Sequence, residues 1–340
     1  MTFLRNAWYM AAWSGEIESE ALFSRRIIDV PILLYRKANA TLVAAVDRCP
    51  HRFAPLSKGA RDGDTVVCGY HGLAFDTDGQ CVRNPFSERI PPNARIQTFP
   101  VVEKHTAIWI WPGDKALADE ALIPDLAFMD SPAVGKGLLP IAAHYELLSD
   151  NLMDLSHIEF VHTGTFGGGG VIMQGQHSVE EEASGAIWSN WWMPAIAPPP
   201  WATFLPQDGK FDHWLEMRWN APATMVQRMG IMPAGGDRAQ NPDMMAGHII
   251  TPESATSSHY FYTFFNLGPG SGTPDDPALK AFTDEDKPML EAVQANMDGA
   301  DFWALKPVIL NVDAASVRVR RTLAGLIQKQ DIATPQTAVV

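Results

Sequence analysis

Four side chains in the first quarter of the chain have the types and the spacing that a metal cluster needs. Cys49 and His51 are separated by one residue, and Cys68 and His71 follow after a gap of sixteen residues, with two residues between them. A single intervening residue lets neighbouring side chains reach two adjacent metals, whereas the ligands of a structural zinc normally lie two or more residues apart. The spacing therefore favours a two-iron cluster in which the two Cys bind one iron and the two His bind the other.

The sequence around both ligand pairs, residues 48–52 and 68–72, is typical of turns. Turns expose backbone N–H groups that can donate hydrogen bonds to the sulfurs of a cluster and tune its potential. A cluster with two Cys and two His ligands is a Rieske [2Fe-2S] cluster, and its reduction potential lies above that of an all-thiolate cluster. The first part of the chain is therefore predicted to carry electrons.

The composition indicates a globular protein with two domains. The chain has 340 residues, of which 46% are hydrophobic and 19% are charged, and this length is sufficient for two hydrophobic cores. If two of the three Cys bind iron, only Cys81 remains, so we expect no disulfide framework and a cytoplasmic location. The formal net charge of −13 argues against a nucleic-acid partner, because phosphate binding needs a basic surface. No uninterrupted apolar stretch is long enough to span a bilayer, so we expect no membrane partner.

The pattern of hydrophobic residues predicts an α+β protein. Residues 1–114 contain short β-type runs separated by turn signals, which indicates a small all-β domain for the cluster. Residues 115–340 begin with a stretch rich in Pro and Gly and continue with long strand-like runs and helical patterns. These patterns predict a catalytic domain with an antiparallel sheet and helices on one face, a helix-grip-like arrangement. The expected strands include residues 186–192, 214–219, 224–232 and 259–265, and the expected helices lie near residues 150–162, 284–298 and 313–329.

A second metal site is indicated by Asp154, His157 and His162, which lie close together in one predicted helix. His157 and His162 are five residues apart, so on a regular α-helix they point about 140° away from each other. They can bind one metal only if the helix is locally unwound, for example by a π-type turn. Two His that lack one carboxylate are typical of the mononuclear Fe(II) sites of oxygenases, which keep positions open for dioxygen and water. Taken alone, His157 could equally be an ordinary histidine beside acidic neighbours.

Six segments of the chain are similar to segments of one known family: residues 5–9 (RNAWY), 49–57 (CPHRFAPLS), 70–73 (YHGL), 150–154 (DNLMD), 247–253 (GHIITPE) and 285–287 (EDK). Over nearly its whole length the chain thereby resembles the Rieske non-haem iron oxygenases. Within this family it resembles the oxygenase components of the aromatic O-demethylase branch, to which vanillate and dicamba demethylases belong. Leu73 stands where ring-hydroxylating dioxygenases usually carry Trp, and this departure favours the demethylase branch.

The resemblance implies that Asp286 completes the mononuclear iron site with His157 and His162. From the sequence alone, Asp286 is one of three consecutive acids at a predicted helix start, where carboxylates also suit the helix dipole. The ligand role of Asp286 therefore depends on the resemblance.

The resemblance also implies that Asp154 and Asn151 are catalytic residues. The family holds the two metals of one chain far apart, so electrons would pass between neighbouring chains of a homotrimer arranged head to tail. Asp154 would then accept hydrogen bonds from His157 of its own chain and from His71 of the next chain. The simpler alternative is that Asp154 only caps its helix.

The substrate residues are less clearly marked in the sequence. His248 is implied by the resemblance, whereas Gln227 and Arg228 are polar in an otherwise apolar strand and could hold a substrate carboxylate. The glycine-rich residues 167–170 could gate access to the site. Large apolar side chains near a run of three prolines could cradle an aromatic ring or simply fill the core of the sheet; these are Trp188, Trp191, Trp192, Met193, Trp201 and Phe204.

The expected function is that of a terminal oxygenase. No nucleotide-binding or flavin motif is found in the sequence, so the electrons must come from a separate NAD(P)H-dependent reductase, alone or with a ferredoxin. With a Rieske cluster, Fe(II) and O2 as co-substrate, the expected reaction is monooxygenation of a small methoxylated aromatic acid with release of formaldehyde. The alternatives are a ring-hydroxylating dioxygenase and a Rieske electron carrier. A carrier would need only the first domain and would give no role to His157 and His162.

Replacement of a cluster ligand gives the first test. In Cys68→Ser we expect the ultraviolet–visible and electron paramagnetic signals of the Rieske cluster to be lost while the second domain stays folded, because only the first domain binds the cluster. The matched control is Cys81→Ser, which should keep both signals. A normal cluster spectrum in Cys68→Ser would contradict the assignment.

Overall fold

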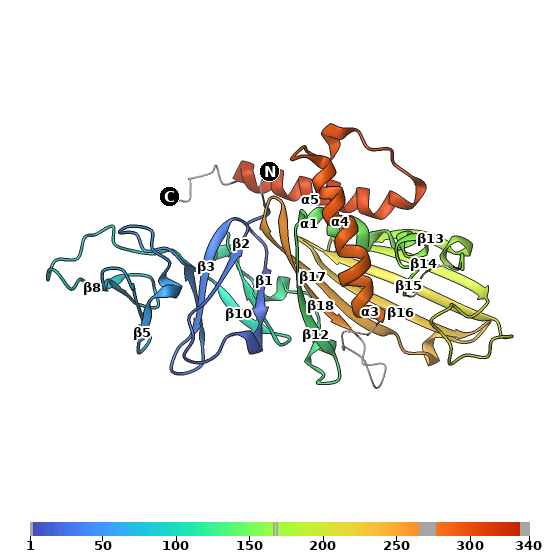
Figure 1. Ribbon diagram of the computed structural model, residues 1–340, viewed down its shortest axis with the longest axis horizontal. Coiled ribbons are helices and arrows are strands. Elements are labelled where there is room, and N and C mark those ends of the chain that lie inside the picture. The colour runs from blue at the N-terminus through green and yellow to red at the C-terminus, as the bar shows by residue number, and fades with distance from the viewer. Residues whose placement is uncertain (1–2, 166, 168, 265–276, 334–340) are drawn as a thin grey trace. The chain divides into compact units, whose positions relative to one another are not determined.

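The structure of the protein is a computed structural model that describes residues 3–165, 167, 169–264 and 277–333. The chain forms two compact units, residues 1–123 and 124–340, whose strands and helices are drawn in Figure 1. The first unit contains strands and short 3-10 helices, and the second contains an antiparallel sheet and helices. The predicted α+β class is therefore confirmed.

The first unit contains three antiparallel sheets. One is formed by β1 (Tyr9–Trp13), β11 (Ala107–Ile110) and β10 (Val101–Lys104); the second by β2 (Phe23–Ile27), β3 (Val30–Arg36), β4 (Leu42–Val46) and β9 (Thr98–Phe99); the third by β5 (Ala60–Asp62), β6 (Thr65–Val67), β7 (Ala74–Phe75) and β8 (Cys81–Arg83). The 3-10 helices are η1 (Ser14–Glu16), η2 (Leu56–Lys58), η3 (Lys115–Leu117) and η4 (Glu120–Leu122). Two Asp-Gly turns place Gly63 and Gly79 at φ values of +61° and +81°, the left-handed region that tight turns require and glycine readily adopts.

The first unit ends at Ile123, whereas the sequence suggested a boundary after Asp114. The intervening segment packs on the first unit instead of forming a free linker. The indole N–H of Trp8 donates to the carbonyl of Asp119 (2.8 Å), and Ile123 is buried. The side chain of Trp111 likewise donates to the carbonyl of Asp114 (2.9 Å).

The second unit contains a seven-stranded antiparallel sheet. The strand order is β12 (Gly135–Ile141), β18 (Ser257–Phe264), β17 (Met244–Ser254), β16 (Thr224–Pro233), β15 (Phe211–Asn220), β14 (Ile187–Ile196) and β13 (Gln176–Glu181). The four strand-like runs predicted from the sequence all lie in this sheet, although Phe265, the last residue of one run, lies outside the described residues. The run from 224 to 232 coincides with β16 to within one residue.

The helices of the second unit gather on one side of this sheet, as Figure 1 shows. The α-helices are α1 (Tyr145–Met153), α2 (Ile158–Val161), α3 (Pro277–Lys280), α4 (Lys287–Met297) and α5 (Ala314–Ala333), and a π-helix, η9 (Ala281–Asp286), joins α3 to α4. The 3-10 helices are η5 (Ala127–Asp130), η6 (Leu155–His157), η7 (Ile172–Gln174), η8 (Arg238–Gln240), η10 (Trp303–Leu305) and η11 (Asn311–Asp313).

A buried ion-pair cluster holds α5 against α1. Arg320 of α5 is 6% exposed, and it donates to the carboxylates of Asp150 (2.6 Å) and Glu146 (2.9 Å) on α1. Its guanidinium also lies 4.0 Å from the ring centre of Phe302. Removing one partner would leave an uncompensated buried charge, which is strongly destabilising. This cluster therefore fixes α1, the helix that carries Asn151.

Among the described residues, no helix is long and apolar enough to cross a membrane.

Candidate metal sites

The four predicted cluster ligands come together with their cysteines buried and their histidines near the surface. Cys49 and Cys68 are 1% and 2% exposed and belong to a hydrophobic cluster of the first unit. The ring centres of His51 and His71 are 4.5 Å apart, and the His51 side chain is exposed. This arrangement suits a cluster whose Cys-bound iron faces the interior and whose His-bound iron faces outward.

The two ligand loops have the same backbone pattern. In the first loop the N–H of Cys49 donates to Ala54, and the N–H of Phe53 donates back to Cys49. In the second loop the N–H of Cys68 donates to the carbonyl of Leu73, and the N–H of Gly72 donates to the carbonyl of Cys68. The fifth position of each loop is left-handed, with φ values of +60° at Phe53 and +73° at Gly72. Only Gly adopts this conformation without cost, so the strain at Phe53 points to a constrained site.

Burial and backbone N–H groups act in opposite directions on the sulfur of Cys49. Burial raises the pKa of the Cys49 thiol to about 11, the neighbouring Cys68 adds to this increase, and the backbone N–H groups of His51 and Arg52 oppose it. Those N–H groups lie where they can donate to a ligating sulfur, as expected from the turn-like sequence. The residues present therefore fit a Rieske cluster.

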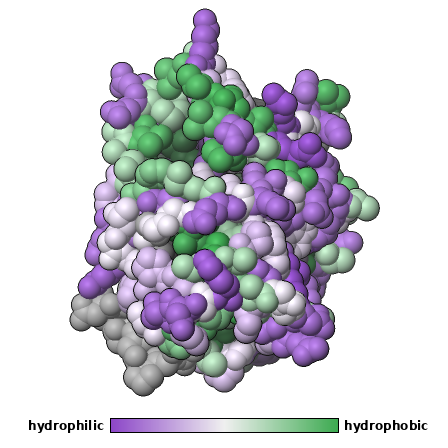
Figure 2. Space-filling view, turned by 90° about the vertical axis from the view of Figure 1, so that its right-hand side faces the viewer, coloured by the Kyte–Doolittle hydropathy of each residue, from purple (hydrophilic) through white to green (hydrophobic). Residues whose placement is uncertain are grey.

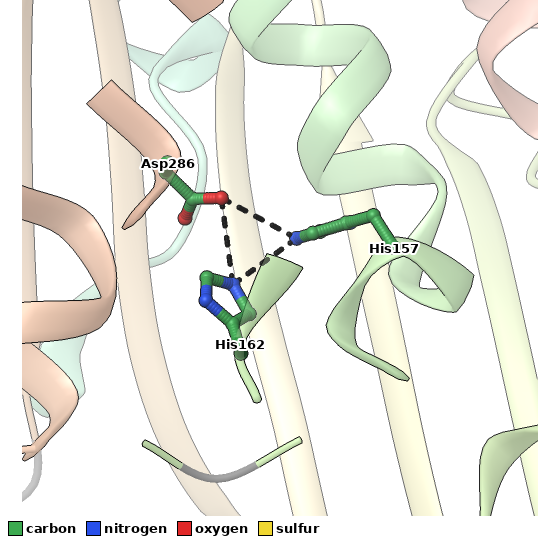
Figure 3. A group of neighbouring side chains, drawn as sticks. All are labelled: His157, His162 and Asp286. Carbon is green, nitrogen blue, oxygen red and sulfur yellow. Dashed lines mark hydrogen bonds and ion pairs between the residues drawn. The ribbon is translucent and has the colours of Figure 1, made fainter. Parts of the chain in front are cut away.

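The second site brings His157, His162 and Asp286 to one point, as Figure 3 shows. The two Nε2 atoms are 3.3 Å apart, and Oδ1 of Asp286 lies 3.6 Å from His157 Nε2 and 3.4 Å from His162 Nε2. Two ligands that bind a metal at about 2.1 Å and at right angles are about 3 Å apart. The three atoms are therefore spaced as one face of a metal's coordination sphere. Their ligand atoms all lie within 4.8 Å of one another.

The predicted local unwinding occurs, but its form differs from the expected π-type turn. His157 ends the 3-10 helix η6, α2 is a single turn, and His162 is the C-cap of α2. This break rotates the two imidazoles toward each other. The π-helix is instead η9, which ends at Asp286. A π-helix has a wider turn than an α-helix, and such segments occur frequently at functional sites.

The imidazoles of the two His ligands differ in their other hydrogen bond. His157 Nδ1 donates to the backbone carbonyl of Asp154 (2.5 Å), whereas His162 Nδ1 lies 2.9 Å from the carboxylate of Glu285. Burial lowers the pKa of His157, and the charge of Asp286 only partly opposes this. Burial also acts to lower the pKa of His162, but Asp286 and Glu285 outweigh it, so that pKa is raised. Both Nε2 atoms point toward the shared site.

Asn151 lies beside the site, and Asp154 does not make the contact expected of its carboxylate. The side-chain amide of Asn151 donates to Asp286 Oδ1 (3.2 Å). The carboxylate of Asp154 accepts from the N–H (3.0 Å) and the hydroxyl (2.6 Å) of Ser156, so it caps η6. The hydrogen bond of His157 goes to the carbonyl of Asp154 and not to its carboxylate. The bridge to a neighbouring chain stays a prediction.

Two of the three predicted substrate residues lie on the face of the sheet that the helices cover. His248 in β17 pairs with Met225 in β16, and Gln227 lies two residues after Met225 in β16. The side chains of His248 and Gln227 therefore point to the same face of the sheet. His248 Nε2 is 3.4 Å from Gln227 Oε1, and Phe282 of η9 lies beside His248. Burial lowers the pKa of His248 to about 4, with the charge of Asp286 opposing this, so the imidazole is neutral at pH 7.

Arg228 does not lie with His248 and Gln227, because adjacent residues of a strand point to opposite faces, and its substrate role stays a prediction. Its guanidinium lies 4.8 Å from the ring centre of Trp188, on the face away from His248. The same alternation divides the large apolar residues that were predicted to lie around an aromatic substrate. Trp191 and Met193 share the face of His248, whereas Trp188 and Trp192 lie on the other. Trp201 contacts His213, while Phe204 is 71% exposed.

The structure adds two residues that the sequence reasoning missed. The hydroxyl of Tyr260 lies 2.6 Å from His248 Nδ1, and both side chains are buried. Tyr260 pairs with Leu139 and Ile250 in the sheet. Tyr260 and Tyr262 are two residues apart in one strand and therefore share a face, and this pattern could have identified Tyr260 from the sequence. The other is Glu285, whose position beside a predicted ligand was visible but whose role was not.

Residues 167–170, which the sequence suggested as a gate, are held at the described positions. The N–H of Gly167 donates to the carbonyl of His162 (2.7 Å). The buried carboxylate of Glu159 accepts from the N–H groups of Gly170 (3.0 Å) and Ile172 (2.7 Å). Residue 168 lies outside the described residues, and the gating role stays a prediction.

Two domain families match the chain. Residues 7–100 match the Rieske [2Fe-2S] domain, and residues 141–329 match the vanillate O-demethylase oxygenase C-terminal domain. The first match contains all four predicted cluster ligands, and the second contains all three residues of the second site.

Similar proteins cover nearly the whole chain. The oxygenase component of dicamba O-demethylase from Stenotrophomonas maltophilia is 38% identical over 96% of this chain and 99% of its own length. The oxygenase component of chloroacetanilide N-alkylformylase from Rhizorhabdus wittichii is 36% identical over 96% of this chain and 97% of its own. The crystal structure of dicamba monooxygenase with non-heme iron and dicamba is similar with a TM-score of 0.79, at 34% identity over 98% of this chain and all of that one.

Replacement of the carboxylate tests the second site. In Asp286→Ala we expect loss of turnover and a decrease from three irons per chain to two with an unchanged cluster spectrum, because only the mononuclear site loses a ligand. Iron analysis and the visible spectrum of the purified protein measure this.

The matched control is Asp284→Ala, which removes an exposed acid two residues away. Full activity in Asp286→Ala would mean that another carboxylate binds the metal. Asp154 or Glu159 would then be the next candidate, although each of these carboxylates already accepts two hydrogen bonds.

Proposed function

The chain belongs to the Rieske non-haem iron oxygenases of the vanillate O-demethylase family, and we propose that it is the terminal monooxygenase that demethylates a methoxylated aromatic acid. The observation that carries the proposal is the convergence of His157, His162 and Asp286 beside a sheet face with polar anchors. We propose that these three side chains bind the mononuclear iron of this family and that Cys49, His51, Cys68 and His71 bind its [2Fe-2S] cluster. The number of Cys suits a cytoplasmic enzyme.

Cys49, His51, Cys68 and His71 would hold a cluster that supplies electrons, and His157, His162 and Asp286 would hold an iron that supplies dioxygen activation, so that one oxygen atom could enter a substrate C–H bond. If that bond belongs to an aryl methoxy group, the product is a hemiacetal. It collapses to a phenol and formaldehyde, and the second oxygen atom leaves as water after two electrons and two protons are added. The protein must hold the methyl group at the iron and keep bulk water away.

His248 and Gln227 are proposed to anchor the substrate. Burial and the charge of Asp286 raise the pKa of Tyr260 well above its ordinary value, so its phenol stays protonated and can donate to His248 Nδ1. The neutral His248 then carries its proton on Nε2, where it can donate to a substrate oxygen. The amide of Gln227 beside it offers a second donor. Together they suit a carboxylate or a phenolic oxygen.

Two indole groups on the same face support a polar ligand. The N–H groups of Trp191 and Trp219 are buried and have no hydrogen-bond partner within the described part of the chain. Trp219 lies in the same cross-strand row as Met225 and His248. An unsatisfied buried donor is costly, so a bound molecule with acceptor oxygens would relieve the cost.

Electrons are proposed to enter through the surface around the cluster ligands. His51 and His71 line a cleft of about 460 Å³, and exposed Phe86 is also part of it. Exposed Phe53 and Tyr70 add apolar area near the ligands. A surface of this kind suits docking of a separate reductase or ferredoxin.

The distribution of charge supports a head-to-tail homotrimer. Residues 1–123 contain 14 Lys and Arg and 14 Asp and Glu, so the whole net charge of −13 lies in residues 124–340. The segment that carries His51 also contains three cations, Arg48, Arg52 and Lys58. Contact between this segment and the acidic unit of the next chain would be electrostatically favourable.

The second unit also has an exposed apolar surface that a neighbouring chain could cover. Figure 2 shows hydrophobic side chains gathered toward the top of the face that it draws. The segment that joins α4 to α5 lies at the top of this unit in Figure 1. Its exposed apolar residues are Trp303, Leu305, Val308, Ile309 and Leu310. An apolar patch of several neighbouring residues usually marks an interaction surface.

A product assay tests the proposed reaction. With a surrogate reductase and a panel of methoxylated aromatic acids, we expect one substrate to yield equal amounts of phenol and formaldehyde per dioxygen consumed. Asp286→Ala should yield neither product. Labelled dioxygen distinguishes the alternative: two labelled oxygen atoms in the ring product, with no formaldehyde, would identify a dioxygenase.

Substitution of Asp154 tests transfer between chains. In Asp154→Asn we expect both metals and the trimer to be retained, while electron transfer from reduced cluster to iron slows by orders of magnitude in a single turnover, because the proposed bridge loses its charge. Ser156→Ala is the control, since it removes the hydroxyl that Asp154 binds at its own helix. Unchanged transfer in Asp154→Asn, or a fully active monomer, would defeat the proposal.

A further inference from the structure

The carboxylate of Glu285 contacts both a proposed iron ligand and the chain that follows this ligand. Its Oε2 atom lies 2.9 Å from Nδ1 of His162 and accepts the hydroxyl of Thr165 at 2.7 Å. Its Oε1 atom accepts the backbone N–H of Gly164 at 3.1 Å. Glu285 thus contacts three of the four residues from His162 to Thr165. Its contact with His162 joins residues that are 123 positions apart in the sequence.

The π-helix η9 explains how Glu285 and Asp286 reach the same imidazole from different sides. Asp286 Oδ1 faces Nε2 of His162, and Glu285 faces Nδ1, on the far side of the ring. Glu285 and Asp286 are adjacent at the end of η9, and adjacent residues of a helix diverge by about 100°, so the two carboxylates reach His162 from different sides. The ring is therefore fixed in position and orientation.

Among the residues that the structure describes, no carboxylate contacts Nδ1 of His157, and this difference makes the role of Glu285 specific. The Nδ1–H of His157 donates to a neutral carbonyl. An imidazole that donates to a carboxylate is a more basic ligand than one that donates to a carbonyl. In addition, Glu285 adds a second carboxylate next to Asp286, and together they would balance the two positive charges of a ferrous ion.

We propose that Glu285 is the positioning residue of the mononuclear site, which orients His162 for the metal and ties the 164–165 segment to it. The inference rests on the proposed function only for the identity of the metal. Loss of the carboxylate should weaken metal binding, and it should also speed hydrogen exchange in the 164–165 segment. Loss of an unrelated acid should do neither.

Two variants of Glu285 separate its charge from its contacts. Glu285→Gln keeps the shape and one acceptor oxygen but removes the charge, and Glu285→Ala removes all three contacts. Thr165→Val removes one contact and leaves His162 held. The control is Asp284→Asn, an exposed neighbour whose carboxylate accepts from the hydroxyl of Thr283.

The measurement is metal binding by the full-length protein with its cluster in place. The mononuclear site is emptied with a chelator and titrated with Co(II) under anaerobic conditions. We expect the dissociation constant to rise about 10–100-fold in Glu285→Ala, as for other partners of metal-bound His, and less in Glu285→Gln. The dissociation constants of Asp284→Asn and Thr165→Val should rise far less than that of Glu285→Ala, because both variants keep the carboxylate that contacts His162.

Hydrogen exchange gives a second, local readout. The N–H of Gly164 should exchange faster in Glu285→Ala, because its acceptor is gone, whereas the N–H of Ile172, which Glu159 holds, should not change. An unaltered Co(II) affinity in both Glu285 variants would overturn the proposal, as would an unaltered exchange rate at Gly164. If the unchanged protein and Asp286→Ala bind Co(II) equally, the iron site itself is misassigned, which is a separate failure.

Discussion

The buried carboxylate of Asp286 is the constraint on which the catalytic unit depends. The residue is 4% exposed, and a buried charge is costly unless it is paired and hydrogen-bonded. Its partners are the amide of Asn151 and the two imidazoles. Asn151 comes from α1, the two imidazoles come from the broken helix that follows it, and Asp286 itself ends η9. The packing of these elements is therefore inseparable from the geometry of the site.

The rest of the second unit holds these elements in place. Arg320 binds α1 through Asp150 and Glu146, while Glu285 joins η9 to the segment after His162. The sheet provides the opposite wall, where His248 faces the helices beside Phe282. Charge pairing fixes the helices, and strand alternation decides which side chains the site can use. Arg228 lies on the face away from His248 for this reason.

The two candidate metal sites have opposite exposure, and the difference agrees with their chemistry. At the first, the cysteines are buried but His51 is exposed, as the proposed entry of electrons from a docked protein requires. At the second, His162 and Asp286 are almost fully buried, which suits an activated oxygen that must be kept from water. The exposure of the two candidate sites thus suits electron exchange at the first and oxygen chemistry at the second.

The sequence by itself determined what depends on short spacing or local pattern. The Cys and His pairs lie within a few residues of each other, so their spacing alone indicated the cluster, and strand patterns located most of the large sheet. The tertiary structure decided what depends on contacts between distant segments. It brought Asp286 to His157 and His162, it gave the hydrogen bond of His157 to a backbone carbonyl instead of the Asp154 carboxylate, and it placed Glu285 on His162. Sequence patterns report the near neighbours of a residue, whereas these contacts join segments more than a hundred residues apart or depend on how a helix is broken.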